Sequence, residues 1–155
     1  MNKVLKFIGA VLICQLVGAS GGFFTAMSVK TWYQQINKPF FNPPNWLFAP
    51  VWTMLFLLMG ISLYLVWQKQ GQQPIKKAIT IFALHFLVNI VWSMAFFGLR
   101  SPLAGLIVII ILLIMIIWTM VEYYKISKLA SLLFIPYLLW SSFATLLNAS
   151  IYYLN

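Results

Sequence analysis

The sequence divides into five long stretches without a charged side chain, separated by short polar or proline-rich segments. At a rise of about 1.5 Å per residue, roughly 20 helical residues cross the ~30 Å hydrocarbon layer of a bilayer. A run such as Leu106–Ile117 is apolar without alternating, which does not suit a strand of a transmembrane barrel. The pattern therefore predicts an all-α integral membrane protein, a single five-helix transmembrane domain over residues 1–155. The predicted helices are 4–29, 46–68, 77–99, 102–124 and 128–153.

Composition supports this prediction, because the chain has too few charged residues to cover a surface in water. Charged residues make up 7% of the sequence, against about 25% in a typical soluble domain. The formal net charge is +9, but the basic residues lie singly or in pairs at the edges of apolar stretches. We therefore expect the lipid bilayer as the partner of this surface, and we exclude a role in binding nucleic acid.

The distribution of Lys and Arg predicts the topology. With five helices, the N-terminus and the second and fourth loops share one side of the membrane. That side holds seven Lys residues, whereas the other holds Lys30, Lys38 and Arg100. Because positive residues concentrate on the cytoplasmic side, we expect a cytoplasmic N-terminus and an external C-terminus. The first uncharged stretch, Phe7–Val29, is long enough to span the bilayer, so we expect a retained helix and not a cleaved signal peptide.

The long connection at residues 30–45 is rich in proline and aromatic residues. Pro39, Pro43 and Pro44 lack a backbone N–H and disfavour helix in the residue before them. We therefore expect an ordered loop outside the membrane. Its four aromatic residues are expected to pack back onto the helix ends.

Polar and aromatic residues recur at helical spacing on three of the predicted helices. Polar groups inside a bilayer usually face the interior of a helix bundle. These faces are therefore candidates to enclose a cavity for a flat apolar ligand. The same spacing is typical of helix-packing seams, and the pattern alone leaves both interpretations open. The rows are Trp52 and Phe56; His85, Asn89, Trp92 and Phe96; and Pro136, Trp140, Ala144 and Asn148.

Other candidate chemistry is sparse. The single cysteine, Cys14, lies in an apolar run and is expected to be a small buried residue. The single histidine, His85, has no second strong metal ligand beside it, so a packed or hydrogen-bonded side chain is expected. The sequence has no aspartate, no metal-ligand spacing and no glycine-rich phosphate loop. We therefore predict no metal site and no required cofactor. Gly18 and Gly22 have the spacing of close helix packing, within the bundle or in a homodimer.

Three blocks of sequence resemble one known family across nearly the whole chain. Residues 32–52 contain W-Y-Q-Q-I-N-K-P, N-P-P-N-W and A-P-V-W. Residues 89–97 contain N-I-V-W-S and F-F, and residues 136–148 contain P-Y-L-L-W and F-A-T-L-L-N. These blocks resemble the motifs of the tryptophan-rich sensory protein / translocator protein family (TspO/MBR, the peripheral benzodiazepine receptors).

The resemblance implies a compact five-helix bundle, often a homodimer, with a ligand cavity beneath the first loop. The implied ligands are porphyrin and other tetrapyrroles, and synthetic isoquinoline- or benzodiazepine-type compounds. With the helix faces above, the expected ligand-binding residues are Tyr33, Pro43, Trp52, Phe56, Asn89, Trp92, Trp140, Ala144 and Leu147. The expected lid residues of the loop are Trp32, Pro39, Pro44 and Trp46. The fifth helix lacks the basic residue that ends the cholesterol motif proposed for animal members. We therefore expect a bacterial protein of the cell (inner) membrane.

Three functions are compatible with this resemblance. The leading hypothesis is a membrane receptor or sensor in which indole rings stack on a tetrapyrrole and Asn89 supplies a polar contact. The second is a light- and oxygen-dependent porphyrin-degrading enzyme, with Trp52 and Trp140 as the candidate catalytic electron donors. The third is a transporter of porphyrin or another amphipathic small molecule, which the lack of an internal repeat disfavours. The natural ligand is not determined by the sequence.

Overall fold

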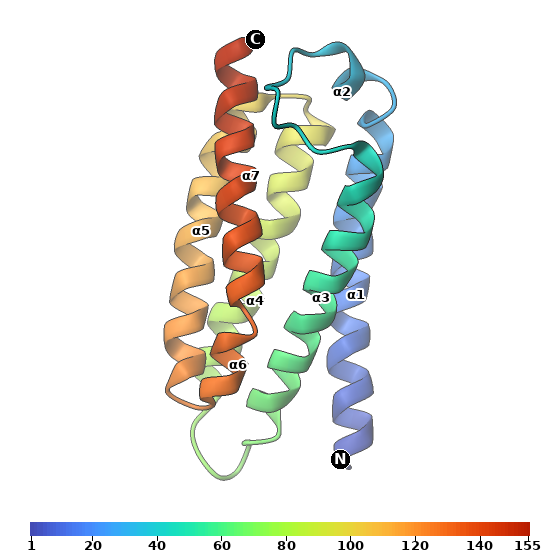
Figure 1. Ribbon diagram of the computed structural model, residues 1–155. Coiled ribbons are helices and arrows are strands. Elements are labelled where there is room, and N and C mark those ends of the chain that lie inside the picture. The colour runs from blue at the N-terminus through green and yellow to red at the C-terminus, as the bar shows by residue number, and fades with distance from the viewer.

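Five helical segments, each long and apolar enough to cross a membrane, run side by side in the computed structural model of residues 1–155 (Figure 1). Their ends lie within one residue of the predicted ranges. In chain order the elements are α1 (Lys3–Ser28), α2 (Trp32–Gln35), α3 (Asn45–Trp67), α4 (Lys76–Ser93), the π-helical turn η1 (Met94–Gly98), α5 (Pro102–Tyr124), α6 (Lys128–Leu132) and α7 (Ile135–Leu154).

The outer surface of the bundle is apolar along its length. On α5, Ile107, Ile110 and Ile114 are all exposed, and similar residues line the outer faces of α1 and α7. Such a surface suits lipid acyl chains and not water, whereas most backbone hydrogen bonds form within the helices. The N-terminus and the two loops that carry most of the Lys residues lie at one end. The C-terminus and α2 lie at the other (Figure 1).

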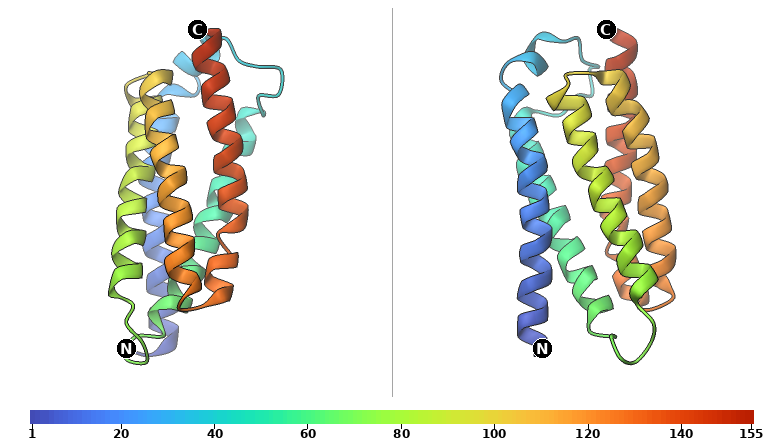
Figure 2. Two further views of the ribbon diagram at one scale, coloured as in Figure 1. Left: turned by 90° about the vertical axis from the view of Figure 1, so that its left-hand side faces the viewer. Right: turned by 180° about the vertical axis from the view of Figure 1, so that it is seen from behind.

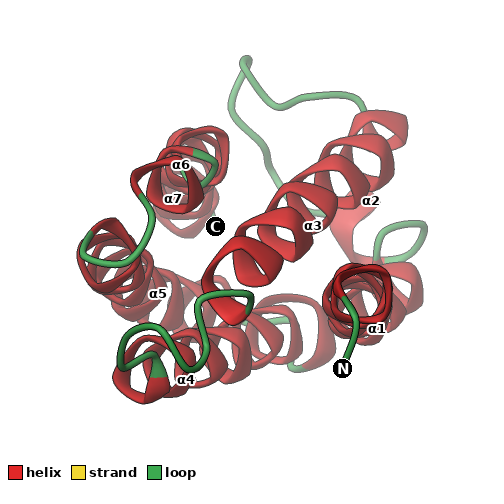
Figure 3. Ribbon diagram, turned by 90° about the horizontal axis from the view of Figure 1, so that it is seen from below, coloured by secondary structure: helices red, strands yellow, loops and turns green.

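The order of the helices follows from their contacts. Helix α1 packs against α3 and α4, α4 packs against α5, and α5 packs against α7 (Figure 3). Helices α3 and α7 meet mainly through large aromatic side chains. The Phe48 and Trp140 ring centroids are 6.3 Å apart, and those of Trp52 and Tyr137 are 6.2 Å apart. These side chains therefore occupy the space in the middle of the bundle.

The fifth predicted helix is interrupted near its start. Helix α6 ends at Leu132 and α7 begins at Ile135. Pro136 has no N–H to donate to the Leu132 carbonyl, so the α-helical pattern cannot continue through this position. Instead, the Phe134 N–H donates to the Ser131 carbonyl at 3.0 Å, which tightens the chain into a turn. The continuous helix predicted over residues 128–153 is therefore two helices.

Helix α4 ends in a wider turn than expected. The Leu99 N–H donates to the carbonyl of Met94, five residues earlier, at 2.7 Å. Both Phe96 and Phe97 in this π-helical turn are buried. Such turns are rare and often mark functional regions of helices. Arg100 then takes a left-handed conformation (φ 53°), which allows the chain to reverse into α5.

Asn148 connects three helices in the interior. Its Nδ2 donates to the Pro102 carbonyl at 2.8 Å, and its Oδ1 accepts from Trp92 Nε1 at 3.2 Å. Gly105 permits this approach, because a Cβ there would lie 2.9 Å from Asn148 Oδ1 and 2.8 Å from the Phe96 ring. A buried amide with both ends paired avoids the cost of an unsatisfied polar group in the membrane.

Candidate functional site

The loop between α1 and α3 lies over one end of the bundle (Figure 2), and Tyr33 anchors it there. The Tyr33 side chain is 1% exposed, and its ring packs edge-on against Phe48 and Phe96. Its hydroxyl donates to Asn42 Oδ1 at 2.6 Å. Burial raises the pKa of Tyr33 to about 12, although the hydrogen bond to Asn42 opposes this rise. The neutral phenol therefore holds the loop at ordinary pH.

Hydrogen bonds to the end of α7 hold the loop from its other side. The Asn37 N–H donates to Asn155 Oδ1 at 3.0 Å, and Asn155 Nδ2 donates to the Asn37 carbonyl at 2.8 Å. Lys38 Nζ donates to the Tyr33 carbonyl at 2.6 Å. Because side chains satisfy these backbone groups, the loop is ordered without regular secondary structure beyond α2.

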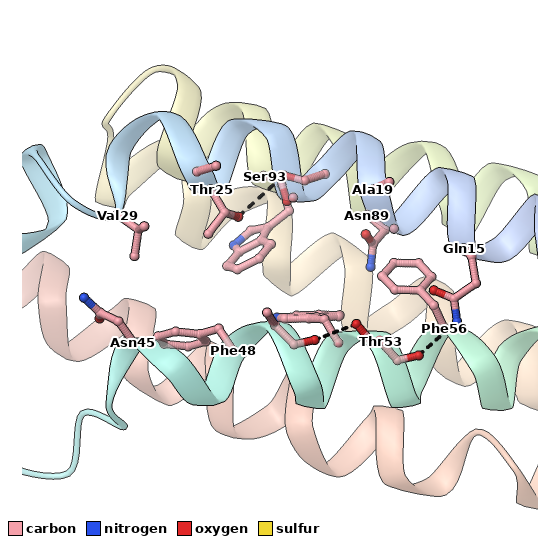
Figure 4. A pocket seen from close by; sticks show the side chains of 17 residues that line it. Gln15, Ala19, Thr25, Val29, Asn45, Phe48, Thr53, Phe56, Asn89 and Ser93 are labelled. Atoms are coloured by element: carbon pink, nitrogen blue, oxygen red, sulfur yellow. Dashed lines mark hydrogen bonds between the residues drawn. The ribbon is translucent and has the colours of Figure 1, made fainter.

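A cavity of about 390 Å³ lies between α1, α3 and α4 beneath this loop (Figure 4). Small residues of α1, including Gly21, Gly22 and Ala26, form one side. Aromatic side chains form the other side, and Gln15, Asn89 and Ser93 add polar groups; the aromatic residues are Phe48, Trp52, Phe56 and Trp92. This combination of apolar walls and a few polar groups is typical of small-molecule sites.

A second, much smaller cavity of about 30 Å³ lies on the α7 side of the same aromatic wall. Phe48, Trp52 and Trp92 border both cavities and therefore separate them. A space of this size holds about one water molecule. A larger ligand can use it only if one of the three rings moves. The residues that complete it include Tyr33, Trp140, Ala144, Leu147 and Asn148.

The indole N–H of Trp140 is buried and has no hydrogen-bond partner. An orphaned buried donor costs roughly 1–3 kcal/mol, so native structures rarely retain one without a reason. The ring of Trp140 borders the smaller cavity. Its N–H is therefore available to an acceptor atom of a bound molecule.

A buried polar cluster lies behind the aromatic wall. Tyr137 Oη is 2.8 Å from His85 Nε2 and accepts from Asn89 Nδ2 at 2.7 Å. His85 Nδ1 is 3.1 Å from the Phe82 carbonyl, so this histidine is hydrogen-bonded and buried as expected. The side-chain nitrogen of Asn89 donates to Tyr137. The side-chain oxygen of Asn89 has no partner within the protein, and Asn89 lines the larger cavity.

The predicted ligand-binding residues fall into two groups around the aromatic wall. Trp52, Phe56, Asn89 and Trp92 line the larger cavity. The smaller cavity is lined by Tyr33, Trp52, Trp92, Trp140, Ala144 and Leu147. Pro43 lines neither, although it follows Asn42, the partner of Tyr33.

The predicted lid residues lie outside both cavities. Trp32 packs edge-on against Phe96 with ring centroids 5.5 Å apart. Pro39 borders an open groove beside Phe40 and the end of α7. Pro44 is exposed, and Trp46 is 70% exposed. Tyr33 lines the smaller cavity, and Asn45, where the loop joins α3, lines the larger one.

Sequence reasoning missed Phe48 and most of the α1 side of the larger cavity. Phe48 lies four residues before Trp52, on the same helix face as Trp52 and Phe56, so its spacing was a signal for it. The α1 side includes Gly18 and Gly22, whose spacing the sequence analysis assigned to helix packing. Small residues on an otherwise apolar helix were thus the available signal, because they leave room for a ligand as well as for a neighbouring helix.

Five helices long and apolar enough to span a membrane, with an ordered loop at one end and a cavity beneath it, define a multi-pass membrane protein with an aromatic-lined cavity. The sequence matches the TspO/MBR family over residues 10–154. It is 49% identical over 153 residues to the tryptophan-rich protein TspO of Archaeoglobus fulgidus, covering 99% of both chains. It is 43% identical over 160 residues to that of Chlorobaculum tepidum, covering 100% of this chain and 99% of the relative.

The similarity extends to animal proteins. The chain is 32% identical over 139 residues to the translocator protein of Sus scrofa, covering 86% of this chain and 82% of the relative. The chain therefore belongs to the TspO/MBR family.

Proposed function

We propose that this protein is a membrane receptor that binds a tetrapyrrole, such as a porphyrin, against the aromatic wall beneath the first loop. The observation that carries the proposal is the wall itself, in which Phe48, Trp52 and Trp92 border space on both sides. A flat apolar macrocycle gains most from rings that offer their faces without the entropy cost of long flexible side chains.

Two unused polar groups suit the polar atoms of such a ligand. The side-chain oxygen of Asn89 can accept a hydrogen bond from a pyrrole N–H, and the N–H of Trp140 can donate to an acceptor atom. The larger cavity, at about 390 Å³, is within the range of small-molecule sites. It is bordered by exposed residues such as Ala19, Ala26 and Ala49, so substituents of a macrocycle can extend between α1 and α3.

The same site suits smaller fused-ring ligands of the isoquinoline or benzodiazepine type, which would fill the larger cavity without extending beyond it. Residues 30–45 would act as a lid, because Tyr33 connects the loop to the aromatic wall. Opening of the loop would then admit or release the ligand.

We place the protein in the bacterial cell membrane with the loop and both cavities near the external side. The seven Lys residues at the opposite end support this orientation. We also propose a homodimer through α1, where a small exposed residue outside the cavity, Ser20, would let a second copy approach closely.

Titration of the purified protein with protoporphyrin in the dark tests the proposed function. We expect saturable quenching of tryptophan fluorescence in the wild type and weaker binding in Trp52→Leu. Trp118→Leu is the matched control, because Trp118 is 44% exposed on the outer face of α5. Quenching that never saturates, or that is the same in both variants, would contradict a site at this wall. Uptake of porphyrin into sealed proteoliposomes would instead support transport.

Light-dependent degradation of the bound porphyrin is a second candidate function. The observation that favours it is the close series of oxidisable rings at the cavity. Trp52 lies 6.1 Å from Trp92 and 6.2 Å from Tyr137 between ring centroids. Loss of the porphyrin spectrum on illumination, with a new product band, would support this function.

A further inference from the structure

We propose that Tyr137 and His85 form a proton-coupled electron donor behind the aromatic wall. When Trp52 is oxidised, Tyr137 supplies an electron to it and passes its phenolic proton to His85. This inference rests on the proposed binding of a tetrapyrrole. It adds a proton acceptor, His85, and gives Tyr137 a defined role, and neither residue lines a cavity.

The hydrogen bonds define the direction of the proton. A carbonyl oxygen only accepts, so the His85 nitrogen facing the Phe82 carbonyl, Nδ1 at 3.1 Å, carries the proton. In a neutral imidazole the other nitrogen then has a lone pair. Tyr137 Oη, 2.8 Å from His85 Nε2, therefore donates to it. Asn89 Nδ2 donates to the same Tyr137 oxygen at 2.7 Å and fixes the hydroxyl in this orientation.

The electron has a short path to the cavities. Trp52 borders both of them, and its ring centroid is 6.2 Å from that of Tyr137 at an angle of 73°. The Trp52 and Tyr137 rings therefore form an edge-on aromatic pair. A ligand stacked on Trp52 would be separated from Tyr137 by this one indole.

The step balances with a photoexcited tetrapyrrole as the oxidant. The excited ligand takes one electron from the Trp52 indole, and Trp52 takes one electron from Tyr137. The O–H bond of Tyr137 breaks as an N–H bond forms at His85 Nε2. Tyr137 becomes a neutral phenoxyl radical, His85 becomes an imidazolium ion, and the ligand is reduced by one electron. Return of the electron and the proton restores the starting state.

The surroundings explain why the proton must move to His85. A phenol that has lost an electron is a far stronger acid than a neutral phenol, so it gives its proton to a base that it contacts. His85 is the base within hydrogen-bonding distance. After the transfer, both imidazolium N–H groups still have acceptors, the Phe82 carbonyl and the Tyr137 oxygen. The network thus accommodates the charge by reversing a single hydrogen bond.

Two other buried tyrosines lack this arrangement, and Tyr123, which lines neither cavity, serves as the control. The hydroxyl of Tyr33 donates to an amide oxygen, Asn42 Oδ1, which is not a base for this purpose. The hydroxyl of Tyr123 is buried without any partner. If burial alone made a tyrosine a donor, all three would behave alike.

The first experiment uses the protein without ligand. His85 is the single histidine, so ¹⁵N NMR of histidine-labelled protein reports one imidazole. We expect a protonated Nδ1 and an unprotonated, hydrogen-bonded Nε2. Tyr137→Phe should shift the Nε2 resonance toward that of a free acceptor, and Tyr123→Phe should leave it unchanged. A proton on Nε2 in the wild type would overturn the proposal.

The second experiment uses protein loaded with protoporphyrin in the dark to equal occupancy, then illuminated and frozen for electron paramagnetic resonance. With ring-deuterated tyrosine in place of ordinary tyrosine, the wild-type radical signal should narrow. Tyr137→Phe should lose the tyrosyl signal and leave a tryptophan radical, whereas Tyr123→Phe should keep it. His85→Gln retains an acceptor but no base, so the tyrosyl signal should be lost there too.

The outcomes separate this inference from the proposed function. Failure of saturable binding in the dark would refute the tetrapyrrole receptor. Binding with a tryptophan radical alone in the wild type, or a tyrosyl signal that survives in Tyr137→Phe or His85→Gln, would refute the donor pair and leave the receptor intact.

Discussion

Trp52 contacts aromatic rings from its own helix and from two others. Its ring centroid is 5.9 Å from Phe56 in α3, 6.1 Å from Trp92 in α4 and 6.2 Å from Tyr137 in α7. None of these pairs is a parallel stack. Tilted and edge-on pairs are favoured by the ring quadrupoles, so the wall is stable without a ligand while its faces border open space.

Trp140 and Trp118 are chemically identical but lie in different surroundings. Trp140 borders the smaller cavity with an unpaired N–H, whereas Trp118 lies on the outer face of α5. Trp140→Ala should weaken porphyrin binding by about 1–3 kcal/mol, by analogy with the loss of one base-stacking ring. Trp118→Ala should leave it nearly unchanged. Dark titrations of both variants make the comparison, and equal affinities would argue against a ligand on the α7 side of the wall.

Replacing an indole by a phenyl ring separates stacking from electron donation. Trp52→Phe and Trp140→Phe should retain much of the porphyrin binding, because phenylalanine keeps a flat apolar ring. Each should slow light-dependent degradation, because phenylalanine is much harder to oxidise than tryptophan. The measurement is the degradation rate per bound porphyrin at equal occupancy and light dose. Identical rates in the wild type and both variants would mean that degradation does not depend on these residues.

Asn148 should contribute more to stability than other polar residues of α7. Asn148→Ala removes its bonds to Pro102 and Trp92 and leaves the Trp92 N–H unpaired in the interior. We expect a loss of about 1–3 kcal/mol in the free energy of unfolding, the cost of an orphaned buried donor. Thermal unfolding in detergent measures it. Ser150→Ala on the same helix is the control, because Ser150 bonds only to a carbonyl of its own helix near the surface.

At the scale of the element, two irregular turns shape the site. The π-helical turn η1 brings Phe96 and Phe97 into the interior next to Tyr33. The turn between α6 and α7 allows the two helices to run in different directions (Figure 2). Both turns occur where backbone hydrogen bonding departs from the α pattern, at Leu99 and before Pro136. Such departures are a common way to place side chains that a regular helix would direct elsewhere.

The docking of residues 30–45 should weaken at high pH. Tyr33 ionises near its ordinary pKa of 10 when the loop is undocked, but only at about 12 when it is docked. The contribution of the neutral phenol is therefore fully present below pH 10 and is lost as pH rises toward 12. A fluorescent probe on a cysteine at Gln34, in a Cys14→Ser background, should become more mobile over this interval. In Tyr33→Phe this mobility should not change between pH 10 and 12; an identical rise in both proteins would exclude Tyr33 as the cause.

At the scale of the whole molecule, charge is distributed unevenly between the two ends. The single acidic residue, Glu122, lies at the end that carries most of the Lys residues and pairs with Lys77 at 3.4 Å and Lys125 at 3.2 Å. Both Lys side chains are largely exposed, so these pairs add little to stability. The excess of positive charge at this end remains large and favours a cytoplasmic location.

Cysteine labelling on whole cells tests this topology. In a Cys14→Ser background, an impermeant thiol reagent should label a cysteine at Gln35, in the loop, and not one at Asn2. The substitution of Cys14 removes the single native thiol. Labelling at Asn2 without labelling at Gln35 would invert the assigned orientation and place both cavities near the cytoplasm.

The number and ends of the helices follow from the sequence, because hydrophobic length and flanking charge are local properties of a chain in a membrane. The inward placement of Trp52, Asn89 and Trp92 also follows from periodicity together with the family motifs. Even the interruption before α7 has a local cause in Pro136, although the sequence analysis treated that helix as continuous.

The tertiary structure alone decided where open space lies. The motif residues of α7 border a cavity of about 30 Å³, while the larger cavity of about 390 Å³ faces α1, where Gly18 and Gly22 indicated only helix packing. It also decided that His85 and Tyr137, which are 52 residues apart, share a hydrogen bond. Cavities and long-range hydrogen bonds depend on how several helices pack at once, and the pattern along any one helix does not contain that information.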